Sequence, residues 1–272
     1  MSLVKDIKMN LRTSKPGQLA AFFVLTFIIG WLAWIPLLID RAFPTSIAFI
    51  FLFSPAISAL VVTALANGGV GVKDLLKRYF LWKFHIQWYL LAFLLLPAIF
   101  LLAALISFNF NLQSLWTNSP WYFIAASFIF LMFINSGEEI GWRGFALPRM
   151  QELFENPLPV SILLGVIWGA WHLPEYFVPG PNIPLIPFLF LIAGLSIIYM
   201  ILFNNTRGSL LSAVILHAST DIMPRIMQIG NFTAATWILI AGLAWISAVV
   251  LYLLTKSSSS GERASSIETD SI

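Results

Sequence analysis

Two adjacent glutamates, Glu138 and Glu139, interrupt a long apolar stretch of the sequence and are followed by Arg143. No Asp, Glu, Lys or Arg occurs from Phe84 through Gly137, so the acidic pair stands at the end of a charge-free run. An ionisable side chain at the centre of a membrane helix costs about 2.5–3.5 kcal/mol on insertion scales. These residue types in this setting therefore indicate a functional site inside a membrane.

The spacing of these three residues divides their roles. Glu139 and Arg143 are four residues apart with the acid first, which is the favoured order for an ion pair on one helix face. Glu138 points about 100° away from Glu139 around the same helix. The pattern predicts one carboxylate that is neutralised by Arg143 and one that is available for chemistry.

A histidine follows on the next predicted helix. Asn156 and Pro157 are expected to break the first helix and turn the chain back. Glu138 and His172 lie at similar distances along the sequence on either side of this turn, so an antiparallel hairpin would place them at nearly the same depth.

Glycines lie near Glu138 on the first arm of this hairpin and near His172 on the second. Gly137 and Gly141 are four residues apart on the first arm, and Gly165 and Gly169 are four apart on the second. Because this spacing lets membrane helices approach backbone to backbone, the two arms are expected to pack closely against each other.

A second histidine, His217, is followed four residues later by Asp221, which places both on one helix face. At the helical rise, His217 lies about 15 Å beyond Arg207, or about half of a hydrocarbon core that is about 30 Å thick. The candidate catalytic residues are Glu138, Glu139, Arg143, His172, His217 and Asp221.

Each of these residues also has a structural explanation. A lone intramembrane histidine can simply bond across helices. The Glu139–Arg143 pair is explained better as structural than as catalytic, and Trp168 as packing, whereas Asp221 could equally orient His217 or contact a substrate. Together, the three acids would cost roughly 8–10 kcal/mol if left unpaired in lipid, so a wet cavity or a bound ligand must offset them. Chemistry and transport both remain open on this argument.

The composition defines the class of protein. The chain has 272 residues, of which 59% are hydrophobic and 10% charged, whereas soluble domains have about 25% charged residues. This composition excludes an ordinary water-soluble domain.

The run from Leu19 to Ile39 is too long for the apolar part of a signal peptide, so it is read as a retained first span. The absence of cysteine excludes disulfides, thiol catalysis and thiolate metal sites. The net charge is +3, and the positive residues lie in short segments between apolar runs, so the charge does not indicate a nucleic-acid partner.

Charge-free runs predict an all-α, polytopic membrane protein with about eight transmembrane helices. The Lys/Arg bias places both the N- and the C-terminus in the cytoplasm. The expected organisation is a cytoplasmic segment 1–18, three spans within 19–120 with a basic, surface-lying inside loop at 67–85, a core at 121–230, a last span at 231–255 and a disordered tail at 256–272.

Three motifs resemble those of a known family. Glu138-Glu139-x-x-x-Arg143, Trp168-x-x-x-His172 and His217-x-x-x-Asp221 occur in the order seen in the CAAX protease and bacteriocin-processing (CPBP/ABI) membrane proteases. This family includes the eukaryotic Ras-converting CAAX prenyl endopeptidase. The resemblance covers about 121–225. The chain departs from the pattern at Trp168, where Phe is frequent, and at Asp221, where the eukaryotic enzymes have Asn.

The resemblance implies an intramembrane endopeptidase whose site opens toward the cytoplasm. Glu138 would act as general base on a water, while His172 and His217 would position that water or stabilise the oxyanion. Asp221 would orient the site, and Glu139 and Arg143 would hold the helix and help to place the substrate. The expected partners are the lipid bilayer and a membrane-bound or lipidated, CAAX-like peptide.

The family has been described both as metalloproteases and as glutamate-dependent proteases. Zinc is the metal that two histidines and a carboxylate would suit, with His172 and His217 as its ligands. The sequence has no H-E-x-x-H motif, and we favour a site without a tightly bound metal.

Two other functions fit the same residues. A proton-coupled transporter would use the acids and histidines as a relay open to both sides, although the sequence has no inverted repeat. A non-catalytic immunity or scaffold protein of the membrane is the second alternative. The expected location is a bacterial cytoplasmic membrane, crossed several times.

Overall fold

The computed structural model describes residues 14–40, 43, 45–108, 116–178 and 183–269. In these residues the secondary structure is helical, apart from one isolated antiparallel bridge between Trp116 and Met227. Seven helical segments of the described chain are long and apolar enough to cross a membrane. The predicted all-α, polytopic fold is therefore confirmed.

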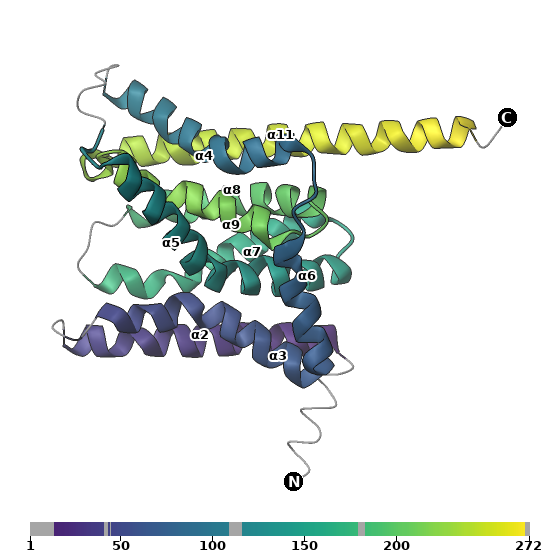
Figure 1. Ribbon diagram of the computed structural model, residues 1–272, viewed down its shortest axis with the longest axis horizontal. Helices are drawn as coiled ribbons and strands as arrows, with labels where there is room; N and C mark the ends of the chain where they lie inside the picture. Colours follow the sequence, from purple (N-terminus) through teal and green to yellow (C-terminus); the bar gives the residue numbers. More distant parts are fainter. Residues whose placement is uncertain (1–13, 41–42, 44, 109–115, 179–182, 270–272) are drawn as a thin grey trace, which may run out of the picture.

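Long helices lie side by side across the molecule (Figure 1). The main helices are α2 (Lys15–Ile39), α3 (Ala48–Lys77), α4 (Ile86–Ser107), α5 (Trp121–Glu139), α7 (Pro157–Trp171), α8 (Leu185–Asn205), α9 (Leu210–Asp221) and α11 (Ala234–Thr269). The shorter helices are η1 (Thr45–Ile47), η2 (Arg78–Phe80), η4 (Ile140–Ala146), α6 (Leu147–Leu153), η5 (Leu173–Phe177), α10 (Met223–Ile226) and η6 (Ile229–Asn231).

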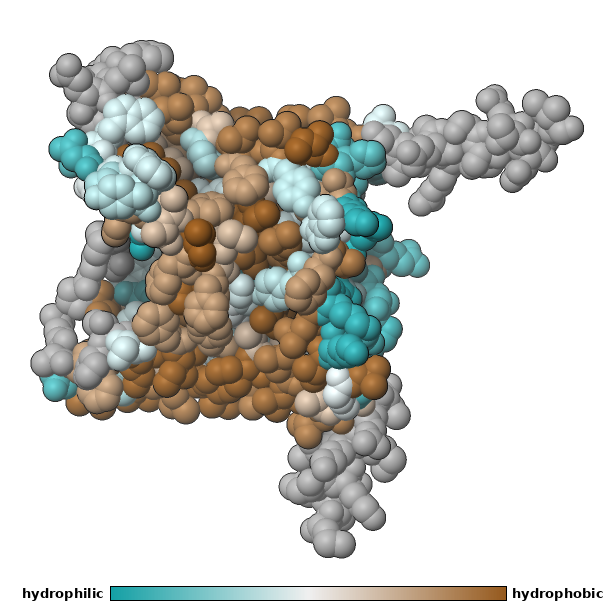
Figure 2. Space-filling view, viewed as in Figure 1, coloured by the Kyte–Doolittle hydropathy of each residue, from teal (hydrophilic) through white to brown (hydrophobic). Residues whose placement is uncertain are grey.

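The outer helices carry the apolar surface expected of a membrane protein. Figure 2 shows hydrophobic residues across the middle of the molecule and hydrophilic residues gathered toward its two opposite edges. Side chains such as Ile28, Leu94 and Ile129 are between 50% and 70% exposed on this surface. α2 begins and α11 ends on the same side of the bundle (Figure 1), which agrees with termini on one side of the membrane. That this side is cytoplasmic remains a prediction.

The predicted span at residues 208–220 differs from a regular crossing. It forms α9, a helix of only 12 residues, which is about 18 Å long. Its residues from Ser212 to Ser219 are all buried, and α9 packs against α4, α5 and α8. A helix that is enclosed by protein does not need to match the thickness of the bilayer, and α9 is shorter than the seven candidate spans, where about eight were expected.

The basic loop predicted at 67–85 begins with a sharp bend in α3. Gly68 has φ +67°, a conformation that glycine adopts readily, and it interrupts the helix. After this bend the chain runs across the end of the bundle rather than along the other helices (Figure 1). This course fits the surface-lying stretch expected from the sequence.

The paired glycines do not bring the two hairpin arms together, as the sequence suggested. A Cβ atom on Gly137 or Gly141 would meet the backbone of α3, whereas one on Gly165 or Gly169 would meet α8. Small residues permit a close approach but do not specify the partner, because every apolar helix offers a suitable surface. The prediction that these glycines bring the two arms together backbone to backbone is therefore wrong, although side chains of the two arms are in contact.

Gly141 is expected to be intolerant of any side chain. In Gly141→Ala the new Cβ would lie 2.4 Å from the Cβ of Pro55 and 2.8 Å from its carbonyl oxygen. Relief requires a shift of the α3 backbone, and overpacking of this kind costs about 1–3 kcal/mol. The measurement is thermal unfolding in detergent, with Gly242→Ala as the matched control, since a Cβ at Gly242 meets nothing within 4 Å. Equal stability of the two variants would contradict the packing of η4 on α3.

α11 continues as a helix to Thr269 and overlaps the segment 256–272. The disorder of that segment, like the other segment boundaries expected from the sequence, remains a prediction.

Candidate active site

The two glutamates lie where a regular helix gives way to a wider one. α5 ends at Glu139, and the next seven residues, Ile140–Ala146, form the π-helix η4, in which every residue is buried. The first predicted helix is therefore not regular up to its expected break at Asn156, because η4 and then α6 follow α5. π-Helical segments are rare and occur often at functional sites.

Glu139 bridges Arg143 and His217 inside the protein. Its Oε1 accepts hydrogen bonds from Nη1 of Arg143 at 3.0 Å and from Nδ1 of His217 at 2.7 Å. The Glu139 and Arg143 side chains are 0% and 1% exposed. The predicted pairing of Glu139 with Arg143 is confirmed, and Glu139 also fixes the position of His217 on α9.

Arg143 is held between two aromatic rings as well as by Glu139. Its guanidinium carbon lies 4.0 Å from the ring centroid of Trp168 and 3.7 Å from that of Tyr199. Cation–π contacts of this kind stabilise a desolvated guanidinium by about 2 kcal/mol or more. Arg143 therefore links α7 and α8 to the helix that carries the glutamates.

Glu138 is buried but does not pair with Arg143. Its Oε2 accepts a hydrogen bond from Nε1 of Trp168 at 2.6 Å, and the residue is 3% exposed. The carbonyl oxygen of Trp168 lies 2.9 Å from Nδ1 of His172. The sequence indicates only a packing role for Trp168, whereas in the structure it holds both Glu138 and His172. The two arms of the hairpin thus meet at the predicted depth.

His172 follows the last residue of α7, and Trp171 anchors that end. The Trp171 indole stacks on Phe51 at a centroid distance of 3.8 Å and donates a hydrogen bond to Oγ of Ser54. The carbonyl oxygen of Trp171 accepts from Nε1 of Trp31 at 3.1 Å. Contacts with α2 and α3 therefore set the position from which His172 faces the site.

His217 lies between two carboxylates. Its Nδ1 is bonded to Glu139, and its Nε2 lies 3.6 Å from Oδ2 of Asp221, which is beyond hydrogen-bond distance. Because both ring nitrogens face carboxylate oxygens, this environment suits a ring that carries a hydrogen on each nitrogen. The side chain of Asp221 is 38% exposed, so this edge of the site is open.

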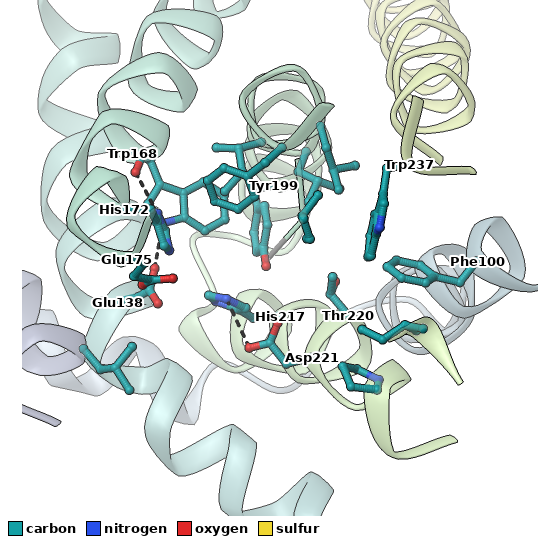
Figure 3. Close-up of a pocket in the computed structure, with 18 residues that line it drawn as sticks. Phe100, Glu138, Trp168, His172, Glu175, Tyr199, His217, Thr220, Asp221 and Trp237 are labelled. Atoms are coloured by element: carbon teal, nitrogen blue, oxygen red, sulfur yellow. Dashed lines mark hydrogen bonds and ion pairs between the residues drawn. The ribbon is translucent and has the colours of Figure 1, made fainter. Parts of the chain in front are cut away.

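These groups line one cavity of about 290 Å³. Figure 3 shows Glu138 and His172 at one end of it, Phe100 and Trp237 at the other, and His217 and Asp221 between them. Four of the six candidate residues therefore share this cavity. Glu139 and Arg143 are not among the residues that line it, and they contact it through His217 and Trp168.

Three kinds of residue that line the cavity were not predicted from the sequence. Glu175 lies on η5 and faces the cavity, and Tyr199 approaches it from α8 (Figure 3). The signal for Glu175 is present in the sequence, because it is the one acidic or basic residue between 156 and 206, histidine apart. Its position between two apolar runs is also typical of a loop residue. Phe100 and Trp237 lie outside the three motifs, and no pattern in the sequence connects them to the site.

The residues do not form a recognisable metal centre. Among the described residues no group of three His, Asp or Glu side chains is arranged to hold an ion. Nδ1 of His217 is bonded to Glu139, and Nδ1 of His172 faces a backbone carbonyl, contacts that orient an imidazole whether or not its other nitrogen binds a metal. The zinc site with His172 and His217 as ligands therefore stays a prediction, and the mechanism proposed below uses the side chains alone.

An apolar helical bundle that encloses a buried acid and two imidazoles beside an open cavity defines a polytopic membrane protein with a polar site in its interior. Residues 120–223, which include all six candidate residues, match the sequence model of the family described as Type II CAAX prenyl endopeptidase Rce1-like. CAAX prenyl protease 2 of the archaeon Methanococcus maripaludis is 25% identical over 256 residues, which cover 86% of this chain and 93% of that protein. The predicted resemblance to the CAAX prenyl endopeptidases is confirmed.

Proposed function

We propose that this protein is a membrane-embedded endopeptidase that hydrolyses a peptide bond of a membrane-associated or lipidated, CAAX-like protein. The observation that carries the proposal is the meeting of Glu138, His172 and His217 on one cavity whose far wall is apolar. The similarity to proteins described as CAAX prenyl proteases supports the same reaction. A bacterial origin of the membrane, and the narrower bacteriocin-processing branch of the family, remain predictions.

Glu138 is the general base of the proposed reaction. Trp168 occupies Oε2, which leaves Oε1 to accept a proton from a water in the cavity. The water oxygen attacks the substrate carbonyl carbon as its proton passes to Glu138. Collapse of the tetrahedral intermediate breaks the C–N bond, and the protonated Glu138 returns the proton to the leaving amine.

His172 positions the water. A backbone carbonyl can only accept a hydrogen bond, so the contact with Trp168 places the hydrogen of a neutral His172 on Nδ1. Nε2 is then an acceptor. An acceptor beside Glu138 can hold the second hydrogen of the attacking water and leave the oxygen lone pair directed at the carbonyl.

His217 stabilises the oxyanion. Glu139 holds Nδ1, and Asp221 is beyond hydrogen-bond distance of Nε2, so a hydrogen on Nε2 is available to a substrate oxygen that gains negative charge. Hydrogen-bond donors that are already oriented toward such a charge often lower the activation barrier more than any other single effect. Glu139, Arg143 and Asp221 are positioning residues in this scheme, because they act through His217 and Trp168.

The apolar wall of the cavity indicates the substrate class. Phe100 on α4 and Trp237 on α11 contact each other edge to face at 5.8 Å, and Leu191, Leu195 and Ile229 complete this wall. Such a surface suits a lipid chain or apolar side chains near the cleaved bond, while the carboxylate and imidazoles face the bond itself.

The test is cleavage of a prenylated CAAX peptide and its unprenylated counterpart by the purified full-length protein in micelles, followed by mass spectrometry of the products. We expect cleavage of the prenylated peptide and a higher KM for the other, because the apolar wall loses its ligand. The same rate is expected after treatment with a chelator. Loss of activity on chelation and its recovery with zinc would contradict the metal-free mechanism. Absence of cleavage across prenylated and apolar membrane peptides, with folded protein, would contradict the function.

A further inference from the structure

A second cavity, of about 380 Å³, lies on another part of the molecule. It is formed by α3 on both sides of its bend, by η2, and by the segment from η4 to α6. None of its lining residues belongs to the first cavity: Thr63, Asn67, Val70, Gly71, Asp74, Leu75, Arg78, Gly144 and Arg149.

Two guanidinium groups face this cavity. Arg149 donates from Nε to Oε1 of Gln18 at 2.8 Å and from Nη1 to the carbonyl oxygen of Phe145, both neutral acceptors. Arg78 lies over the ring of Phe203 at 5.6 Å. Among the described residues, no carboxylate lies within ion-pair distance of either arginine.

The acids in this region are paired with lysines. Asp74 also lines the cavity, but it accepts a hydrogen bond from Lys77 at 3.0 Å. Glu152 forms an ion pair with Lys15 and acts on the two arginines only from a longer distance. Two arginines therefore line one space whose single lining carboxylate, Asp74, is bonded to Lys77 rather than to either of them, an arrangement that suits an anion.

A buried hydroxyl points to the same kind of ligand. Thr63 lines the cavity and is 3% exposed, yet its Oγ1 has no hydrogen-bond partner in the described part of the chain. An unsatisfied buried polar group costs about 1–3 kcal/mol. Oγ1 itself has almost no accessible surface, so a rotation about χ1 that brought it to an anionic oxygen in the cavity would remove this cost.

The surroundings place the cavity at the level of lipid headgroups. The segment after Gly68 crosses the end of the helical bundle (Figure 1), and Phe80 and Trp82 beside Arg78 are 78% and 58% exposed. Exposed aromatic rings gather at the membrane–water interface, and basic pockets between helices at that level bind phosphate headgroups.

We propose that this cavity binds the phosphate of an anionic phospholipid, with Arg78 and Arg149 as charged donors and Thr63 as a neutral donor. Charge complementarity and the interfacial position favour a lipid over a phosphate ion from solution. The site is independent of the proposed proteolysis, since it shares no residue with the first cavity.

The test is binding of short-chain phosphatidylglycerol to the full-length protein in neutral detergent, measured by native mass spectrometry and thermophoresis. Phosphatidylcholine of the same chain length and inorganic phosphate are the comparison ligands. Arg78→Gln and Arg149→Gln should each weaken phosphatidylglycerol binding about tenfold, and Thr63→Val about threefold. Lys73→Gln, which removes an exposed charge from the same helix outside the cavity, should leave the affinity unchanged.

The variants also separate binding from folding, because Arg149 holds Gln18 and its loss could loosen α6. Thr63→Val and Arg78→Gln retain that contact, so weaker binding by these two supports the proposal on its own. Equal affinity of all variants, equal affinity for the two lipids, or equally tight binding of inorganic phosphate would overturn the assignment to an anionic lipid. A defect in Lys73→Gln as large as in Arg78→Gln would do so too.

Discussion

Glu138→Gln should lower the rate of peptide cleavage about 10²–10⁴-fold, which is the usual contribution of a general base. The amide has the same size as the carboxylate, and its oxygen can still accept the hydrogen bond from Trp168 that is 2.6 Å long in the structure. It cannot take a proton from water. We therefore expect the loss to fall on kcat, with KM nearly unchanged, in initial-rate measurements on a prenylated peptide.

Retained folding is part of this prediction. No cation is bonded to Glu138, so its neutralisation leaves no buried positive charge without a partner in the described residues. Thermal unfolding of Glu138→Gln in the same detergent should match that of the wild type. Wild-type rates from the variant would remove Glu138 from the role of base.

Glu139→Gln should instead destabilise the protein, by about 3–5 kcal/mol. The Oε1 atom of Glu139 is the shared acceptor for Arg143 and His217, and the Arg143 side chain is 1% exposed. A neutral amide would leave Arg143 without its counter-charge in a medium where desolvation is costly, and His217 would keep only the more distant Asp221. Thermal or denaturant unfolding in detergent measures the loss.

The neighbouring glutamates form a matched pair for this experiment. The same substitution is made at adjacent positions with similar burial, 3% and 0% exposed, so the loss of a carboxylate is common to both variants. Only the groups that are bonded to the two carboxylates differ. If Glu139→Gln were as stable as Glu138→Gln, the paired charges around Glu139 would not hold the helices together in the way that their geometry indicates.

The location of the site could be predicted because charge is conspicuous in apolar sequence. Glu138, His172 and His217 are each recognisable by their cost in a membrane, and simple counting of helical rise places them at one depth. The Glu139–Arg143 pair follows from a spacing of four. Such inferences hold because they depend on distance along a helix axis, which changes little when neighbouring helices shift.

The features that were predicted wrongly depend on which helices pack against each other. Distance along a helix axis does not determine this. Gly137 and Gly165 mark faces of close approach, but the sequence does not say that α3 and α8 fill them. α9 is short because other helices enclose it, and its apolar composition looks the same as that of a lipid-exposed span. No residue pattern in the sequence marks η4, since the residue types that form a π-helix also form an α-helix.

A helix bonded in the π pattern advances less around its axis with each residue than an α-helix does. Every side chain after η4 is consequently rotated from the direction that an uninterrupted helix would give it. The seven residues of η4 therefore set the direction in which Arg149 points relative to Glu138. Removing one residue from η4 would turn α6 about its axis, so that Arg149 would leave the second cavity while Arg78 and Glu138 kept their places.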